Sequence, residues 1–308
     1  MESDRFVVRR IDFEGNASVS SETLRQLIRT RTNRTLFGIH GLTPWYFIHR
    51  VTGRFGEAPV YLDREVAFND IERIRLFYES VGYFDASVDT SVTMIRSKLA
   101  RLTFTINEGP QSRIRNVSYR GLPQTIAAEQ RSRFFRQGLS LRRGDPEREA
   151  LADIPYSLQS LRNEQDRIVD FLKNHGYASA QRDSVRLLLR PDPSDPTLLD
   201  ARFDIHPGPD YVFGEITMVL DSPPQVRSGV YDTVSIDMKS VERGESSATG
   251  SMMRSPTMRF IRETTAETRS GVLSDAMNFI PGQLYSQTDL QNSINELQNL
   301  GMLSVTRF

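Results

Sequence analysis

The sequence of 308 residues contains no cysteine, which excludes disulfides, thiolate zinc sites and cysteine nucleophiles together. Its charges balance, with 39 basic and 39 acidic side chains, so the composition does not favour a nucleic acid as partner. No apolar run approaches the roughly 18 residues of a membrane-spanning helix, and the opening MESDRFVVRR lacks the apolar stretch of a signal peptide. We therefore expect either a cytosolic chain or an exported chain whose signal has been removed.

Residue patterns typical of catalysis are also scarce. The chain contains no HExxH, GxSxG or GxxxxGK[ST] sequence. Asp85 and Asp89 occupy alternate positions of a predicted strand and are interpreted as a solvated face. The four histidines do not have the spacing of paired metal ligands. They are His40, His49, His175 and His206. We therefore predict no catalytic residue, no metal site and no cofactor.

One local pattern occurs three times. It reads FYESVGYFDASVD at 77–89, FLKNHGYASAQRD at 171–183 and ELQNLGMLSVTRF at 296–308. In each copy an apolar residue stands four positions before a glycine, which predicts an amphipathic helix that ends at a left-handed glycine. Apolar residues at helical spacing precede the first two glycines, and they are Phe68, Ile71, Ile74, Tyr78, Leu151, Ile154, Leu158, Leu161, Ile168 and Leu172.

Alternating stretches follow the helices. The segments ARLTFTINEGP and LDARFDIHPGP alternate apolar and polar residues and then break at a Gly-Pro turn, which predicts strands. Another alternating stretch begins directly after each turn. The predicted order of a unit is therefore strand, helix, helix, strand, strand, with one sheet face buried under two helices. This is an α+β fold.

The unit order, together with the opening IDFEGN, the strand GYFDASV and the exit INEGP, resembles the POTRA domain, the polypeptide-transport-associated repeat of outer-membrane assembly proteins. The stretch GEAPVYLD at 56–63 is similar to a sequence of the Bacteroidetes branch related to BamA and TamA (TamL-like). The second unit departs from the family pattern, because RGLPQT replaces the usual glycine-asparagine and IHPGP replaces INEGP.

The resemblance implies three tandem POTRA units, each a three-stranded sheet covered on one face by two helices. We expect the first at 5–110 with an aromatic insertion at about 32–60, and the second at 111–210. The third is expected at 211–308, with a long Ser/Thr/Gly-rich loop at about 238–259 and with its closing strand missing. The continuation of the chain is expected to supply that strand and then a transmembrane barrel.

A function follows from the resemblance. It implies a non-enzymatic periplasmic scaffold of an outer-membrane β-barrel insertase or translocation module, attached to the outer membrane through its own C-terminal barrel. Its partners would be unfolded outer-membrane β-barrel precursors and accessory periplasmic or lipoprotein subunits, with no nucleic acid. Two alternatives stay open: the POTRA region of a two-partner secretion transporter, or a non-catalytic soluble α+β interaction protein.

Candidate binding residues follow from the physics of sheet edges. An edge strand presents unpaired N–H and C=O groups, and an unfolded β-protein can pair with them by β-augmentation. In the family the strand after the glycine is the usual edge, and a bulge is expected near Asp183. The predicted client-binding residues are Phe84, Asp85, Ala86, Ser87, Val88, Ala178, Ser179 and Ala180. The aromatic insertion supplies a candidate docking surface at Trp45, Tyr46 and Phe47, although such residues also suit a helix that covers the unit's own core.

Overall fold

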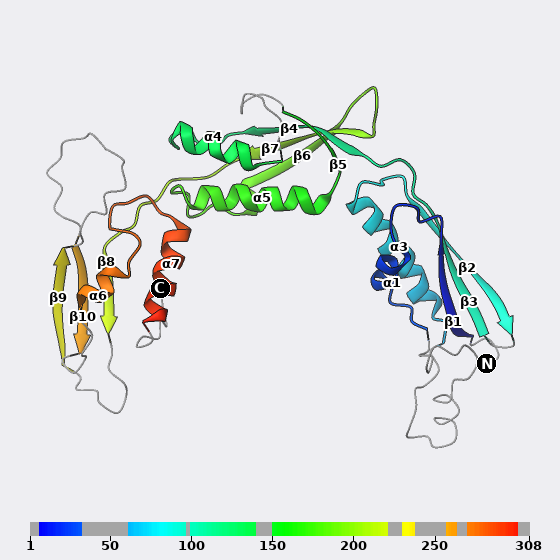
Figure 1. Cartoon of the computed structure of the whole chain (residues 1–308), viewed down its shortest axis with the longest axis horizontal. Coiled ribbons are helices and arrows are strands. Elements are labelled where there is room, and N and C mark those ends of the chain that lie inside the picture. The colour runs from blue at the N-terminus through cyan, green and yellow to red at the C-terminus, as the bar shows by residue number, and fades with distance from the viewer. Residues whose placement is uncertain are drawn as a thin grey trace, which may run out of the picture. The chain divides into compact units, whose positions relative to one another are not determined.

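The computed structural model describes residues 6–32, 61–96, 99–139, 150–220, 230–237, 257–263 and 270–300 (Figure 1). The chain divides into two compact units, the first comprising 1–117, 151–162 and 189–201, and the second comprising 118–150, 163–188 and 202–308. The division into three units with boundaries near 110 and 210 stays a prediction. No helix among the described residues is long and apolar enough to cross a membrane.

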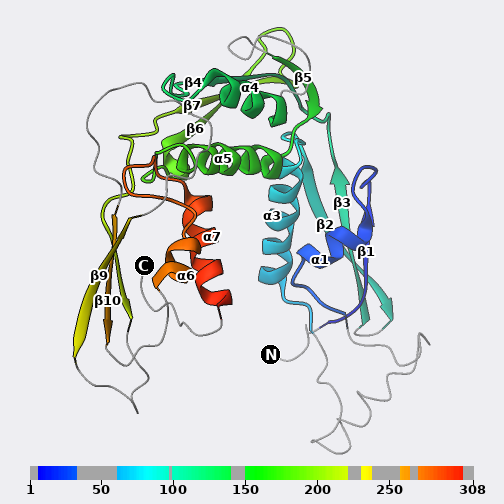
Figure 2. The same cartoon turned by 60° about the vertical axis from the view of Figure 1, so that its left-hand side comes forward.

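The first sheet has the strand order β1-β3-β2, in which β1 (Val7–Glu14) runs parallel to β3 (Leu99–Asn107) and β2 (Ser87–Arg96) runs antiparallel to it. The helices α1 (Ser21–Leu27) and α3 (Arg64–Ser80) lie beside this sheet (Figure 2). Both helices begin at a side-chain cap, because Ser20 and Asp63 accept hydrogen bonds from backbone N–H groups of the first turn. The alternation predicted for β3 is confirmed, since its helix-facing residues Leu102, Phe104 and Ile106 are buried in the core.

The second sheet has four strands in the order β5-β4-β7-β6, one more than predicted. They are β4 (Arg113–Arg120), β5 (Ala150–Pro155), β6 (Val185–Pro191) and β7 (Leu198–Ile205). The helices of this part are α4 (Ala128–Gln137) and α5 (Leu158–Lys173), with a single 3-10 turn, η1 (Arg182–Ser184). Leu151 and Ile154 were expected in a helix, but they lie in β5, and α5 begins at Leu158.

The third sheet has the order β8-β10-β9, formed by β8 (Ile216–Leu220), β9 (Tyr231–Asp237) and β10 (Thr257–Glu263). The helices α6 (Ser270–Asp275) and α7 (Gln287–Asn299) follow these strands, and their residues Leu273 and Leu297 share a core with Met258 and Phe260. The expected order placed one strand before the helix pair, whereas the structure places three there. Thr257–Arg259, the end of the expected loop, belong to β10; the rest of that loop and the strand expected after Gly301 lie outside the described residues.

Candidate strand-binding edges

The strand β2 forms one edge of the first sheet, as the binding hypothesis requires. Of the five residues predicted to form its binding edge, only Ser87 and Val88 lie on the strand. Phe84 and Asp85 lie in the turn between α3 and β2, and Ala86 is buried in the core. The ring of Phe84 contacts the ring of Tyr156, with centroids 5.0 Å apart. The predicted place of Phe84, Asp85 and Ala86 on the edge strand was wrong, because a turn follows the helix-ending glycine before the strand begins.

In the second sheet the corresponding edge strand is β6, and it begins later than predicted. Ala178 and Ser179 lie in a turn, and Ala180 is fully buried, so none of the three belongs to the edge. The bulge expected near Asp183 is instead the 3-10 turn η1. A 3-10 turn shortens the strand that can accept a partner, because its backbone groups do not follow the ladder.

Two hydrogen bonds identify which backbone groups of β6 face the open edge. The Asp192 N–H donates to the Leu198 carbonyl at 2.8 Å, and the His206 N–H donates to the Ser184 carbonyl at 2.7 Å. In both pairs the residue numbers add up to the same value, so even-numbered residues between 184 and 192 point their N–H and C=O groups at β7. The N–H groups of Val185, Leu187 and Leu189 therefore face away from β7.

The same parity applies to β2. In β6 the outward groups belong to the residues with side chains on the helix side, such as the buried Val185. Chirality links the direction of the side chain to the direction of the N–H group in a strand of given orientation. The strand β2 runs antiparallel to its neighbour β3, as β6 does to β7, and helices cover the same face of both sheets. The outward N–H groups of β2 therefore belong to Val88, Thr90, Val92 and Met94.

Apolar side chains near the end of β2 are exposed. Val92, Met94 and Ile95 keep 45%, 49% and 38% of their surface in contact with solvent. The predicted client-binding residues stopped at Val88, although the alternation that begins there continues through Val92 and Met94. The edge of β2 thus combines unpaired main-chain groups with apolar side chains that an added strand would cover.

In the first predicted POTRA unit, the chain just after the opening motif IDFEGN contacts the exit motif INEGP. The Ser18 N–H donates to both carboxylate oxygens of Glu108, at 2.9 and 3.1 Å, and the Tyr78 hydroxyl donates to the same carboxylate at 2.9 Å. Burial would raise the pKa of Glu108, but these donors stabilise the charged form and lower its pKa overall. Burial and the nearby carboxylate raise the pKa of Tyr78. The Glu108 of INEGP therefore has a structural role.

The helices that precede the glycines share a second anchor. Each of α3, α5 and α7 carries a buried polar residue seven positions after the residue that caps or directly precedes the helix. These residues are Asp70 in α3, Glu164 in α5 and Ser293 in α7. Asp70 accepts from the Arg29 and Thr30 N–H groups, both at 2.8 Å, just after α1. Ser293 accepts from the Asn278 N–H at 2.7 Å, just after α6. Asp70 and Ser293 therefore each hold the segment that follows the preceding helix.

The anchor of α5 works through an arginine. Glu164 accepts from the Tyr119 hydroxyl at 2.6 Å and pairs with Arg167, whose guanidinium also donates to the Phe134 carbonyl at 3.0 Å. The same guanidinium lies 3.9 Å from the centre of the Phe134 ring. This network ties α4, α5 and β4 together.

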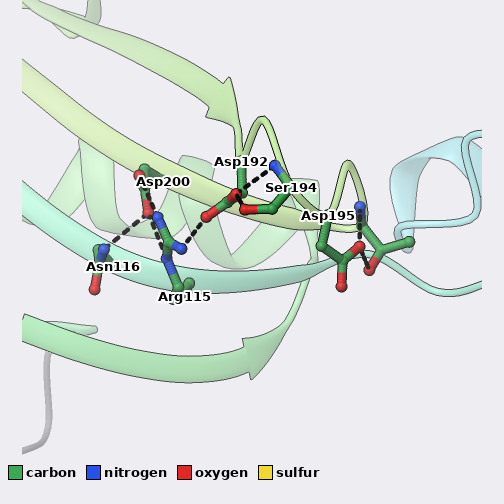
Figure 3. Close-up of polar contacts among 7 residues, drawn as sticks. Arg115, Asn116, Asp192, Ser194, Asp195 and Asp200 are labelled. Atoms are coloured by element: carbon green, nitrogen blue, oxygen red, sulfur yellow. Dashed lines mark hydrogen bonds and ion pairs between the residues drawn. The ribbon is translucent and has the colours of Figure 1, made fainter.

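A polar cluster crosses the helix-free face of the second sheet (Figure 3). Arg115 pairs with Asp192 and, at 3.0 Å, with Asp200, and the Asn116 amide donates to Asp200 at 2.9 Å. Consecutive residues of a regular strand point to opposite faces, so the shared contact of Arg115 and Asn116 indicates a local irregularity in β4. The cluster fixes the turn between β6 and β7, because Asp192 also accepts from Ser194.

The turn makes one pH-dependent contribution to stability. Hydrogen bonds from the Ser194 hydroxyl and N–H, aided by Arg115, lower the pKa of Asp192 from 3.8 to about 2. A lowered pKa means that the contribution is complete above pH 3.8 and is lost as the pH falls through 2. We expect the variant Ser194→Ala to lose less stability than the wild type between pH 4 and pH 2, measured by urea unfolding. Parallel pH curves for the two proteins would show that this carboxylate does not contribute.

The part of the chain that the structure describes contains no group of three or more histidine, aspartate or glutamate side chains that could hold a metal ion. His175 lies at the end of α5, where its Nδ1 is 2.6 Å from the Phe171 carbonyl oxygen, a contact that suits a helix end. The predicted docking residues Trp45, Tyr46 and Phe47 lie outside the described residues.

Residues 6–109 match the family model POTRA, described as surface antigen variable number repeat. The match spans β1 to β3, including the anchor at Glu108 and the edge strand β2. The first sheet and its helices thus match the POTRA model. The match stops at the INEGP exit, where the sequence resemblance also placed the end of the first unit.

Solved structures of POTRA regions resemble the whole chain at low sequence identity. Haemophilus influenzae BamA POTRA3-5 is 17% identical, with 98% of this chain and 89% of that chain covered and a TM-score of 0.42. The N-terminal domain of Omp85 from Thermosynechococcus elongatus is 16% identical, with 96% and 86% covered and a TM-score of 0.32. POTRA1-3 of Omp85 from Anabaena is 13% identical, with 97% and 86% covered and a TM-score of 0.33.

Proposed function

We propose that this chain is a periplasmic POTRA scaffold of a module that assembles or translocates outer-membrane β-barrel proteins, and that it binds their unfolded precursors by strand addition at β2. The observation that carries the proposal is that the residues matching the POTRA model present a ten-residue edge strand with exposed apolar residues. Main-chain pairing suits this task, because it requires no fixed client sequence. We also propose that the chain is related to the TamL-like branch.

The function requires no reaction and no cofactor. A precursor strand would hydrogen-bond to the outward groups of β2 and place apolar side chains over Val92 and Met94. Each of these contacts is weak, so a client could be released when a better partner for its strand is available. The same scaffold would hold accessory periplasmic or lipoprotein subunits, for which Trp45, Tyr46 and Phe47 are the proposed docking residues.

We further propose that three POTRA units follow one another in the chain. Support comes from one hydrogen bond that recurs before each of the helices α3, α5 and α7. The N–H of Leu62, Tyr156 and Tyr285 donates, respectively, to the carbonyl of Phe6, Ser112 and Tyr211, at 2.7, 2.9 and 2.9 Å. Phe6 and Ser112 directly precede β1 and β4, and Tyr211 lies five residues before β8, so a similar local construction occurs three times.

The proposed edge predicts opposite effects of proline at neighbouring positions. Thr90→Pro removes an outward N–H group, so we expect the sheet to stay folded while the affinity for a client strand falls at least tenfold. The loss has two causes: a donor is missing, and the proline ring fills its place. Affinity is measured by fluorescence polarisation, using the whole chain and a labelled ten-residue peptide copied from one strand of an outer-membrane barrel protein.

Two matched variants make this test specific. Thr90→Ala keeps the N–H group and should bind like the wild type. Ser91→Pro removes a donor that points at β3, so it should destabilise the sheet, which circular dichroism would detect. A folded Thr90→Pro protein with unchanged affinity would refute strand addition at β2.

A further inference from the structure

The edges of the first and second sheets differ in charge, and this difference deepens the proposed function on which it rests. On β6 the side chains of Arg186, Leu188 and Arg190 lie on the helix-free face, and all three are exposed. On β2 the corresponding face carries Ser87, Asp89, Ser91 and Thr93, none of which is a cation. At these positions an added strand would therefore meet two arginines on β6 but an aspartate, Asp89, on β2.

The two arginines of β6 have no carboxylate of their own among the described residues. The register derived from the flanking hydrogen bonds places Arg186 opposite Asp204 and Arg190 opposite Asp200. Asp204 is already paired with Arg202 at 3.0 Å, and Asp200 is held by Arg115 and Asn116. Both cations of β6 are thus left for a partner on the open side.

The open edge also brings these side chains close to an added strand. Leu187 and Leu189 would form the hydrogen bonds, because the Val185 carbonyl already accepts from the Gln165 side chain at 2.8 Å. Arg186 and Arg190 would therefore stand in the non-hydrogen-bonded pairs of an antiparallel ladder. Side chains in such pairs are closer together than those in the hydrogen-bonded pairs. Opposite charges directly across a ladder stabilise it, whereas like charges destabilise it.

We propose that β6 selects extended segments that carry two carboxylates four residues apart on one face, and that Arg186 and Arg190 determine this specificity. Carboxylates at that spacing would face both arginines. A second copy of β6 is disfavoured at the symmetric register, because it would place Arg186 of one chain opposite Arg190 of the other. The edge of β2, which carries Asp89, would not share this preference.

The test uses the whole chain and two nine-residue peptides with the same alternating valine framework. They differ only at two positions four residues apart on the face opposite the valines, which carry glutamate in one peptide and lysine in the other. We expect the glutamate peptide to bind about tenfold more tightly at low salt, and the difference to shrink as salt is added. The peptide should also slow the amide exchange of Leu187 and Leu189.

Substitutions distinguish specificity from general attraction. The double variant Arg186→Gln, Arg190→Gln should bind both peptides equally. The control Arg182→Gln should keep the preference, because Arg182 lies in η1 before the strand and is paired with Asp166 at 2.6 Å. Folding of each variant is checked by circular dichroism.

The outcomes separate this inference from the proposed function. Equal binding of both peptides by the wild type, or protection of β2 amides without protection of Leu187 and Leu189, would overturn the role of β6 and leave strand addition intact. A preference that survives in the double variant would overturn the role of the two arginines. Failure of both peptides to bind at either edge would overturn strand addition itself, and this inference with it.

Discussion

Replacing Gly15 by alanine is expected to destabilise the first sheet by about 3 kcal/mol or more. Gly15 has a φ of +84°, in the left-handed region that residues with a side chain rarely adopt. A Cβ atom at this position would lie 2.0 Å from the carbonyl oxygen of Ile106, a backbone atom of β3 that cannot rotate away. Relief of the clash would require β1 and β3 to separate at the point where the opening and exit motifs meet.

The change is measured by urea unfolding of the whole chain, together with amide exchange of the β3 residues. Gly121→Ala is the counterpart in the second sheet, because its Cβ would lie 2.2 Å from the Ile205 carbonyl oxygen. Gly214→Ala is the control, since no atom lies within 4 Å of its Cβ, and we expect a change of at most about 0.5 kcal/mol. If Gly15→Ala unfolded like the control, the close approach of the two motifs would be wrong.

The glycines also show what a single sequence can predict. The pattern before Gly82 and Gly176 predicted helix ends, and both glycines do have positive φ, at 96° and 98°. This prediction succeeds because a helix end is encoded within a few residues. The alternation of β3 and β7 succeeds for the same reason.

Two parts of the fold were missed, for different reasons. Leu151 and Ile154 have helical spacing relative to Leu158, but β5 pairs with β4, and this tertiary contact outweighs the local pattern. The strands β9 and β10 flank a segment rich in serine, threonine and glycine, whose composition masked the alternation of Met258 and Phe260. A short strand carries a weaker signal than a long helix.

The candidate site was only partly predictable. The sequence indicated that an edge strand follows the first glycine, but the outward row of N–H groups depends on strand order and register, which are properties of the folded sheet. The cluster around Arg115 joins residues 77 and 85 positions apart in the chain, so no local pattern could reveal it. Charge at Arg186 and Arg190 was visible, but its meaning depends on which carboxylates are already paired.

Asp70 should be the most sensitive acidic residue in the part of the chain that contains the first sheet and its helices. Its side chain is fully buried on α3. It accepts hydrogen bonds from the Arg29 and Thr30 N–H groups and from the Thr30 hydroxyl, and it pairs with Arg73. Asp70→Ala leaves all these donors without their acceptor, while Arg73, which is partly exposed, can turn to water. We expect a loss of about 3 kcal/mol in the free energy of unfolding.

The pattern of the loss separates an anchor from a general charge effect. Asp70→Asn keeps one carbonyl oxygen and should cost less than Asp70→Ala, because part of the donor set remains satisfied. Asp89→Ala removes the same charge from the exposed strand β2 and should change stability by at most about 0.5 kcal/mol. Amide exchange gives the local readout: the N–H groups of Arg29 and Thr30 should lose protection in Asp70→Ala before the strands do, because they lose their acceptor directly. If their exchange were unchanged in a folded Asp70→Ala protein, Asp70 would not be what holds the chain after α1.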